Sequence, residues 1–333
     1  MSQTLLKVCG NMENIKTLIF TKEEMDQIHE ATLKVLAEPG VLVNNEEARM
    51  ILKKAGCDVN EETRVVKMPR QVVENALKTA PPEFTMYSRD GKHNVRMVSD
   101  GSIVNDMTFG VGTRMITYAG HDNYVCRESV LQDIYDISKV VDSCDNIDWF
   151  CSPVSAMDLA TDPTRSLKEV RAIVANSSKP LLLDPDPSFL EDYFEIEKIC
   201  YNGDEKRAMK EPFFLVGGCP SSPLQLDDVF CQLAIHGPDY GMPFMCLSMA
   251  MGAASSPIFL AGTMVTHNAE VLAGITLVQL ANPGALTFYG SSTTSFDFYH
   301  DAAPVGSPEL ALISAAVAQL AHYYKMPSIV AGT

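Results

Sequence analysis

The pattern of hydrophobic and polar residues divides the chain into two parts. From Ser129 to Thr333, short continuous apolar runs alternate with amphipathic or wholly apolar helical segments. Six of the apolar runs are predicted strands, which begin near Ile147, Pro180, Phe213, Pro243, Ala285 and Pro327. Strands that alternate with helices pair in parallel through right-handed crossovers. Continuous apolar runs are typical of strands whose two faces are both covered.

Two architectures fit such a series, an open doubly wound sheet and a closed barrel. A doubly wound sheet usually opens with a glycine-rich turn that binds phosphate, and none of the strand–helix turns here has that pattern. A complete eight-unit barrel takes about 250 residues, which is more than this part of the chain holds. We therefore predict an α/β fold, a TIM-type (β/α) barrel with six of its eight units, over residues 129–333.

The first 128 residues follow a different pattern. Thr21 is predicted to cap a helix that runs to about Ala37, and further helices are expected over 46–55 and from Pro69 to just before Pro81. Between residues 84 and 127, short β-like runs alternate with turn signals, which predicts an antiparallel meander that includes a strand at 102–104. We expect residues 1–128 to form a small α+β cap on the barrel.

Charge and cysteine usage narrow the classes of partner and compartment. The formal net charge of −16 makes nucleic acid and anionic membranes poor partners. Nine cysteines without a CxxC pair or a zinc-site spacing predict reduced thiols in a cytoplasmic protein without a metal centre. The long apolar segment 258–281 carries Glu270 near its centre, so it is predicted to be a buried barrel helix and not a membrane span.

Chemistry in a barrel lies at the C-terminal ends of the strands, where hydroxyls and glycines dominate this sequence. Asp184 and Asp186 suit proton transfer or a divalent cation, but a turn and helix cap before Ser188 is the favoured interpretation. Gly217 and Gly218 precede a predicted helix near 223, yet no Lys or Arg stands beside them to support an anion site.

Histidines and aromatic residues supply three further candidates. His267 and Glu270 lie one helical turn apart, and a hydrogen-bonded core histidine is favoured over a metal pair. His300 follows the fifth strand, where an active-site role is open. Aromatic residues at 288–289 and 296–299 surround a run of hydroxyls, which fits either a wall for an alkylammonium cation or ordinary barrel packing.

Several long blocks of the sequence resemble one family. The blocks are 247–251 (LSMAM), 255–263 (SSPIFLAGT), 266–272 (THNAEVL), 289–294 (YGSSTT), 303–310 (APVGSPEL) and 330–333 (VAGT). Together they resemble trimethylamine:corrinoid methyltransferase, and the likeness extends over most of the chain from the helix at Thr21 onwards.

The resemblance implies a TIM barrel that moves a methyl group from trimethylamine to the cobalt of a separate corrinoid protein, leaving dimethylamine. It implies that no cofactor is bound directly, because the corrinoid is carried by the cognate partner. It also implies roles in methylamine metabolism and methanogenesis, and a homo-oligomer when the chain is full length.

Family members place pyrrolysine, encoded by an in-frame amber codon, directly after the segment matched by 330–333. The catalytic residue is therefore expected to follow Thr333, flanked by Gly332 and Thr333, and a chain that ends there is expected to be inactive. Such a chain is also expected to leave strands one and six as open edges that self-associate. The residues expected to bind substrate are Ser248, Met249, Tyr289, Ser291, Ser292, Thr293 and Phe296.

Two other functions stay open at this point. Relatives without pyrrolysine demethylate quaternary amines such as glycine betaine, and an unrelated barrel lyase would use Asp184 and Asp186.

The coding DNA gives a direct test of the expected position of pyrrolysine. A TAG codon directly after the codon for Thr333, followed by a further open reading frame, is the expected result. A different stop codon, or a sense codon for a standard amino acid, would contradict it.

Overall fold

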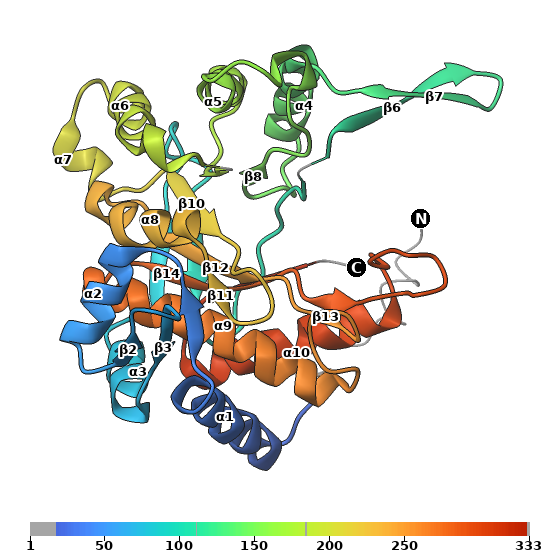
Figure 1. Ribbon diagram of the computed structural model, residues 1–333. Coiled ribbons are helices and arrows are strands. Elements are labelled where there is room, and N and C mark those ends of the chain that lie inside the picture. The colour runs from blue at the N-terminus through green and yellow to red at the C-terminus, as the bar shows by residue number, and fades with distance from the viewer. Residues whose placement is uncertain (1–17, 111, 184, 332–333) are drawn as a thin grey trace.

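A six-stranded parallel sheet forms the centre of the molecule (Figure 1). The structure, a computed structural model, describes residues 18–110, 112–183 and 185–331. The strands are β8 (Phe150–Cys151), β9 (Leu181–Leu182), β10 (Phe214–Gly218), β12 (Phe244–Ser248), β14 (Thr287–Ser291) and β16 (Ser328–Val330). Each lies within a few residues of a predicted start, because the apolar runs locate buried strands well.

The strand order decides between the two architectures. The order across the sheet is β16-β14-β12-β10-β9-β8, so every strand pairs with its neighbours in sequence. A doubly wound sheet reverses direction at a switch point, and this sheet has no reversal. The winding is that of a (β/α) barrel, and the described strands form an incomplete one.

Among the described residues of the second part, seven helices surround the sheet. They are α4 (Leu131–Asp142), α5 (Arg165–Asn176), α6 (Leu190–Cys200), α7 (Glu205–Ala208), α8 (Asp228–His236), α9 (Leu260–Ala281) and α10 (Pro308–Tyr324). Figure 1 shows α4, α5 and α6 along one side and α9 and α10 along the other, with α8 between them. Short 3₁₀ turns lie at Met157–Leu159, Pro187–Phe189 and Pro238–Tyr240.

Helix α9 is apolar because it is enclosed. Its residues are buried without a break from His267 to Gln279, and α1, α3, α8 and α10 all pack against it. A helix that is apolar all round is expected in such a position, so the predicted buried barrel helix is confirmed. In the part of the chain that the structure describes, no helix has the length and hydropathy required to span a membrane.

The N-terminal helices form as predicted. Helix α1 (Lys22–Ala37) begins at a capping box in which the Thr21 hydroxyl accepts from the Glu24 amide and Glu24 accepts from the Thr21 amide. Helices α2 (Glu46–Lys54) and α3 (Arg70–Leu77) follow.

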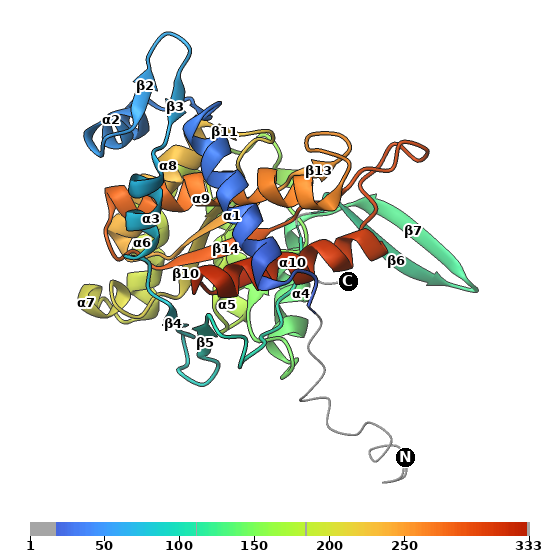
Figure 2. The same cartoon turned by 90° about the horizontal axis from the view of Figure 1, so that it is seen from below.

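These helices do not stand apart from the barrel. Strands β1 (Val41–Val43), β2 (Asp58–Asn60) and β3 (Val65–Lys67) share a sheet with β11 (Gln225–Leu226), which comes from the second part of the chain. In Figure 2, α1 lies across the face formed by α9 and α10. A domain boundary at residue 128 stays a prediction.

The predicted meander is wrong in its connectivity. Two separate hairpins form instead, β4 (Glu83–Met86) with β5 (Val95–Val98), and β6 (Arg114–Gly120) with β7 (Asn123–Glu128). No strand forms at 102–104, because the Asp100 carboxylate accepts from both the amide and the hydroxyl of Ser102 and holds a local turn.

The first hairpin fills the interior of the sheet's curve. Met86, Val95 and Met97 of β4–β5 pack in one cluster with inward-facing residues of the parallel strands, Trp149, Leu215, Met245 and Phe288 among them. Phe288 stacks on Trp149 with ring centroids 5.8 Å apart. The barrel interior is thus a packed core below the strand ends, as in barrels generally.

One expected open edge is covered. Met107 and Gly112 form parallel bridges with Trp149 and Val154, beside β8. The Thr108 hydroxyl donates to the Cys151 carbonyl and accepts from the Cys151 amide, at 2.6 and 2.8 Å. The expectation that strand one has an open edge is therefore wrong, whereas β16 pairs only with β14 among the described strands.

A buried carboxyl group makes stability depend on pH. Glu197 of α6 is fully buried and accepts from the Phe213 amide at 2.5 Å, while its second oxygen has no partner among the described residues. Burial raises the pKa of Glu197 to about 8, well above the ordinary value of 4.5 for a glutamate side chain. The folded state therefore holds its proton more tightly than the unfolded state does.

We expect the free energy of unfolding to fall as the pH rises from about 4.5 through 8, since Glu197 must ionise in the core. The Glu197→Gln variant should lose much of this slope in urea titrations across that range. Equal slopes for the two proteins would contradict the assignment. Glu195→Gln, which changes an exposed residue of the same helix, is the control.

Candidate active site

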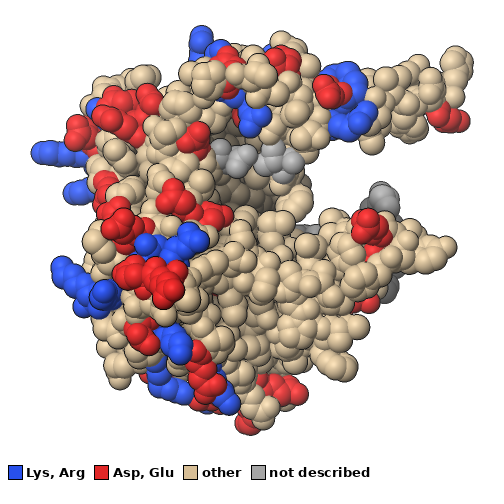
Figure 3. Space-filling model, in the orientation of Figure 1, with Lys and Arg blue, Asp and Glu red and all other residues tan. Residues whose placement is uncertain are grey.

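A cavity of about 450 Å³ lies at the C-terminal ends of the parallel strands. All six strands contribute to its wall, at or just beyond their ends, through Cys151, Leu182, Gly217, Leu247, Ser292 and Ala331. Figure 3 shows the molecule hollowed on this side, between the upper helices and the lower half. This is the face on which barrel enzymes carry their active sites.

The alternation of side chains along each strand decides which residues reach the cavity. In β12, Met245 and Leu247 face inward, whereas Phe244, Cys246 and Ser248 face the helices and are fully buried. Two glycines keep the interior open beside Met245. A Cβ atom on Gly217 would lie 2.9 Å from the Met245 Cε, and one on Gly290 would lie 2.9 Å from its Cγ.

The wall is apolar, rich in sulfur and uncharged in its described part. It includes three methionines and two cysteines, which are Met245, Met249, Met251, Cys151 and Cys219. None of the described lining residues is Asp, Glu, Lys, Arg or His. Such a wall suits a small, largely apolar ligand that has no carboxylate or phosphate to pair.

One polar atom in this wall lacks a partner. Thr294 lines the cavity and is only 6% exposed, and its hydroxyl has no hydrogen-bond partner among the described residues. Buried polar atoms are normally satisfied. The Thr294 hydroxyl therefore has an unused donor just behind the cavity surface, and a rotation of the side chain would present it to a ligand.

Two of the seven residues predicted to bind substrate, Met249 and Ser292, line the cavity. Ser248, Tyr289, Ser291 and Thr293 do not, because they occupy the buried, helix-facing positions of β12 and β14 or lie just beyond them. Phe296 lies on the loop after β15 (Thr294–Ser295) and packs edge-on against Phe298. Gly332 and Thr333, which flank the expected catalytic position, lie outside the described residues.

The buried hydroxyls behind the cavity anchor the strand ends to α9. Glu270 accepts from the Ser248 hydroxyl at 2.7 Å, the Ser222 hydroxyl at 2.8 Å and the Leu224 amide at 3.0 Å. Burial raises the pKa of Glu270, although these donors oppose the shift. The carboxyl group thereby ties the ends of β10 and β12 to the helix behind them.

His267 is a core histidine, as the favoured interpretation predicted. Its Nδ1 lies 2.8 Å from the Thr293 hydroxyl, its side chain is fully buried, and burial lowers its pKa to about 3. No group of three or more His, Cys, Asp or Glu side chains among the described residues is arranged to hold a metal ion.

Tyr289 belongs to a second buried network. Its hydroxyl donates to the Asn268 side-chain oxygen at 2.6 Å, and the Asn268 amide donates to the hydroxyls of Thr32 and Tyr324. The Tyr324 hydroxyl in turn lies 3.0 Å from the Nδ1 of His29. Tyr289 thus links β14 to α1, α9 and α10. Its position is that of an ordinary packing residue between the barrel strands and the helices.

The other candidates have local structural roles. Asp186 caps the turn at Pro187–Phe189 by accepting from the Ser188 amide and hydroxyl, as favoured, while Asp184 lies outside the described residues. No helix begins near 223, and at the helix that follows the Asp227 side chain already caps the N-terminus. The exposed His300 pairs with Asp297 at 2.7 Å, and this hydrogen bond lowers the pKa of Asp297.

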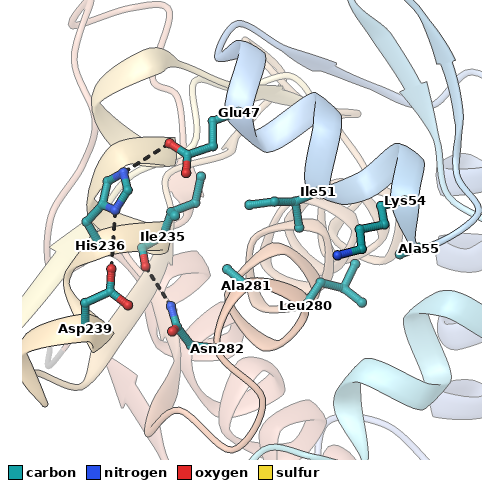
Figure 4. A pocket seen from close by; sticks show the side chains of 10 residues that line it. All are labelled: Glu47, Ile51, Lys54, Ala55, Ile235, His236, Asp239, Leu280, Ala281 and Asn282. Carbon is teal, nitrogen blue, oxygen red and sulfur yellow. Dashed lines mark hydrogen bonds and ion pairs between the residues drawn. The ribbon is translucent and has the colours of Figure 1, made fainter.

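A second hollow, of about 540 Å³, lies at the opposite end of the barrel (Figure 4). Figure 4 shows His236 between Glu47 and Asp239, at 3.1 and 3.4 Å, and the Asn282 amide donates to the Ile235 carbonyl at 2.6 Å. The hollow lies where α8 and α9 end, just before strands begin. In barrels, residues on that face usually contribute to stability and not to catalysis, and His236 here is already paired with both neighbouring carboxylates.

The sequence reasoning missed most of the cavity wall. Phe109 and Gly110, which precede the β6–β7 hairpin, line the cavity from a segment predicted only as part of a meander. The spacing of Met245, Leu247, Met249 and Met251 at every second position was a usable signal, because a period of two indicates one face of an extended segment.

The Tyr289→Phe variant tests whether Tyr289 is structural. It leaves the buried Asn268 oxygen without its donor, so we expect the free energy of unfolding to fall by about 1–3 kcal/mol. Tyr299→Phe is the matched control, because Tyr299 is 90% exposed and should change stability by less than about 0.5 kcal/mol. Equal stabilities of Tyr289→Phe and the unaltered protein in urea titrations would contradict the network.

Comparison with known proteins places this chain in a family. The chain is 48% identical over 323 residues to trimethylamine methyltransferase MttB1 of Methanosarcina mazei, covering 97% of this chain and 65% of that protein. It is 37% identical over 317 residues to trimethylamine methyltransferase MttB of Desulfitobacterium hafniense, a match that covers 94% of this chain and 62% of that protein. A glycine betaine methyltransferase of Desulfitobacterium hafniense strain Y51 is 32% identical over 312 residues, and this match covers 93% of this chain and 63% of that protein.

The chain thus spans about two thirds of the length of the curated relatives that it matches. Among solved structures, the monomethylamine methyltransferase MtmB of Methanosarcina barkeri is similar with a TM-score of 0.48 and 11% identity, covering 92% of this chain and 66% of that one. The sequence pattern of the trimethylamine methyltransferase (MTTB) family matches residues 3–333. The chain therefore belongs to the trimethylamine methyltransferase family.

Proposed function

We propose that the full-length protein transfers a methyl group from trimethylamine to the cobalt of a cognate corrinoid protein, giving dimethylamine. The observation that carries the proposal is a cavity at the strand ends whose described wall is apolar and uncharged, in a chain that belongs to this family. Trimethylamine is small, has three methyl groups for such a wall and has one polar atom. We also propose that the reaction takes place in the cytoplasm.

The Thr294 hydroxyl supplies the polar contact for the amine. Its oxygen is shielded from solvent and has no partner among the described residues. A rotation of the side chain presents it to the amine nitrogen, an acceptor with one lone pair. Donation by Thr294 orients the amine with its methyl groups against Met249, Met251 and Leu247. Holding the reacting methyl group in one direction supplies much of the rate gain in a transfer between two large partners.

The chemical step is a displacement at carbon. The electron pair of the reduced cobalt forms the cobalt–carbon bond, the carbon–nitrogen bond breaks, and its electrons go to nitrogen, which takes a proton from water or from a bound acid. A hydrogen bond from Thr294 to nitrogen stabilises the charge that develops there. The corrinoid supplies the nucleophile and arrives on the partner protein.

Glycine betaine is the second candidate substrate, because a relative acts on it. It carries a carboxylate, and the described part of the cavity wall has no Lys, Arg or His to pair with that group. The absence of a counter-charge among these residues favours trimethylamine. A lyase that depends on Asp186 is disfavoured, because that carboxylate is the cap of a turn.

Incubation with trimethylamine and cob(I)alamin tests the function. Full-length protein should produce methylcobalamin, followed by its absorbance, and one equivalent of dimethylamine, followed by NMR. Glycine betaine should give little product under the same conditions. Product from glycine betaine alone would move the assignment to quaternary amines, and no product from either would contradict methyl transfer.

The Thr294→Val variant tests the polar contact in the cavity. It keeps the shape of the side chain and removes the donor, so we expect KM for trimethylamine to rise about tenfold, which corresponds to about 1.4 kcal/mol. Thr276→Val is the matched control, because Thr276 is also buried with an unpartnered hydroxyl but lies in α9, away from the cavity. Equal KM values for the two variants would contradict the role of Thr294.

A further inference from the structure

The β6–β7 hairpin projects from the molecule as an arm, which we define as residues 114–128 (Figures 1 and 2). All six residues of β7 are exposed, and five of the seven residues of β6 are exposed as well. A lone two-stranded hairpin is only marginally stable in water. An arm of this kind is expected where another surface is present to cover it.

One face of the arm is apolar beyond its first pair, Arg114 and Glu128. The strand register places Ile116 opposite Cys126 and Tyr118 opposite Tyr124, all on the same face. Ile116, Tyr118 and Tyr124 are between 59% and 69% exposed, and the two tyrosine rings lie 5.4 Å apart. Single exposed apolar residues are ordinary, but a contiguous group of large ones indicates an interaction site.

The base of the arm is fixed to the barrel. Arg127 donates through both terminal nitrogens to the Asp133 carboxylate at the start of α4, at 2.8 and 2.6 Å. The Ser129 hydroxyl donates to the Ser155 carbonyl, just beyond the end of β8. The bidentate ion pair and the hydrogen bond of Ser129 fix the direction in which the arm projects.

The arm starts from the wall of the cavity. Phe109 and Gly110 line the cavity, and residue 114 begins β6 only a few residues later. The arm thus rises beside the mouth of the cavity, on the face where the parallel strands end.

The opposite side of the mouth carries a second apolar surface, which we call the rim. It consists of Ile258, Phe259, Phe298, Tyr299 and Val305, on the loops that follow β12 and β14. These side chains are between 69% and 90% exposed, and Val305 also lines the cavity. Figure 3 shows few charged side chains on the lower wall of the opening, whereas Lys, Arg, Asp and Glu gather on the side of α2, α6 and α7.

We propose that the arm and the rim together form the docking surface for the protein that carries the corrinoid. The inference rests on the proposed function, in which a large cofactor on a separate protein must reach the cavity. A carrier seated between arm and rim covers both apolar surfaces and places its cofactor over the mouth.

The area available is sufficient for a specific complex. Aromatic side chains cover about 150–250 Å² each, so the eight exposed apolar side chains of arm and rim offer on the order of 1,000 Å². A standard interface buries about 800 Å² on each partner. A carrier that meets both surfaces therefore has enough contact to bind specifically.

A second copy of the chain is the competing occupant. Two copies that covered each other's arm and rim would close both cavity mouths and exclude the carrier that the reaction needs. Two chains with a net charge of −16 each also repel one another. Both considerations favour the carrier.

Binding of the purified cognate corrinoid protein to the full-length protein, measured by calorimetry, tests the docking surface. The Ile116→Ser/Tyr118→Ser double variant and, separately, Phe259→Ser should each raise Kd at least tenfold. The control is Ile199→Ser, which changes a side chain of α6 that is 73% exposed and lies outside the arm and the rim. Because one variant lies in the arm and one in the rim, the test still decides the question if one of the two variants fails to fold.

Methylation of free cob(I)alamin separates this proposal from the proposed function. The arm and rim variants should keep the rate of the unaltered protein with free cob(I)alamin, since the cavity is intact. Unchanged Kd in both variants would overturn the docking surface while leaving methyl transfer in place. A change in oligomeric state by light scattering, with unchanged Kd, would assign the surface to a second copy and overturn the proposal equally.

Discussion

The two-residue period of the parallel strands is the constraint on which the rest of the structure depends. Inward positions fill the barrel interior up to Met245 and then open into the cavity, while outward positions face the helices. A shift of one residue in register would exchange these two sets. Glu270 opposes such a shift at β12, because its carboxyl group accepts from the outward-facing Ser248.

The cavity therefore has an apolar front and a polar back. Sulfur and aliphatic groups face the interior. Hydroxyl groups on or just after the same strands form hydrogen bonds with Glu270, His267 and Asn268 of α9. Thr294 is an exception, since its hydroxyl is buried beside the cavity and no described residue pairs with it. An enzyme that binds a small amine needs few polar contacts, and this arrangement leaves one donor available.

The sequence predicted the parallel strands and most helices because buried apolar runs and capping signals are local. It predicted the core role of His267 for the same reason, since the residue lies within an apolar helix. The hairpins were harder, because turn signals do not say which strand pairs with which. Tyr289, Ser291 and Thr293 were predicted to bind substrate because they lie near a strand end. Whether a side chain faces the cavity or the helices depends on the alternation along the strand, which is known only once the strand register is known.

We propose that the cavity at the strand ends holds the amine between Thr294 and the methionine wall. A crystal structure of the full-length protein soaked with trimethylamine tests it most directly. We expect electron density for the amine with its nitrogen within hydrogen-bonding distance of the Thr294 hydroxyl and its methyl groups against Met249 and Met251. Density for the amine in the hollow beside His236, with the cavity empty, would contradict amine binding at the strand ends.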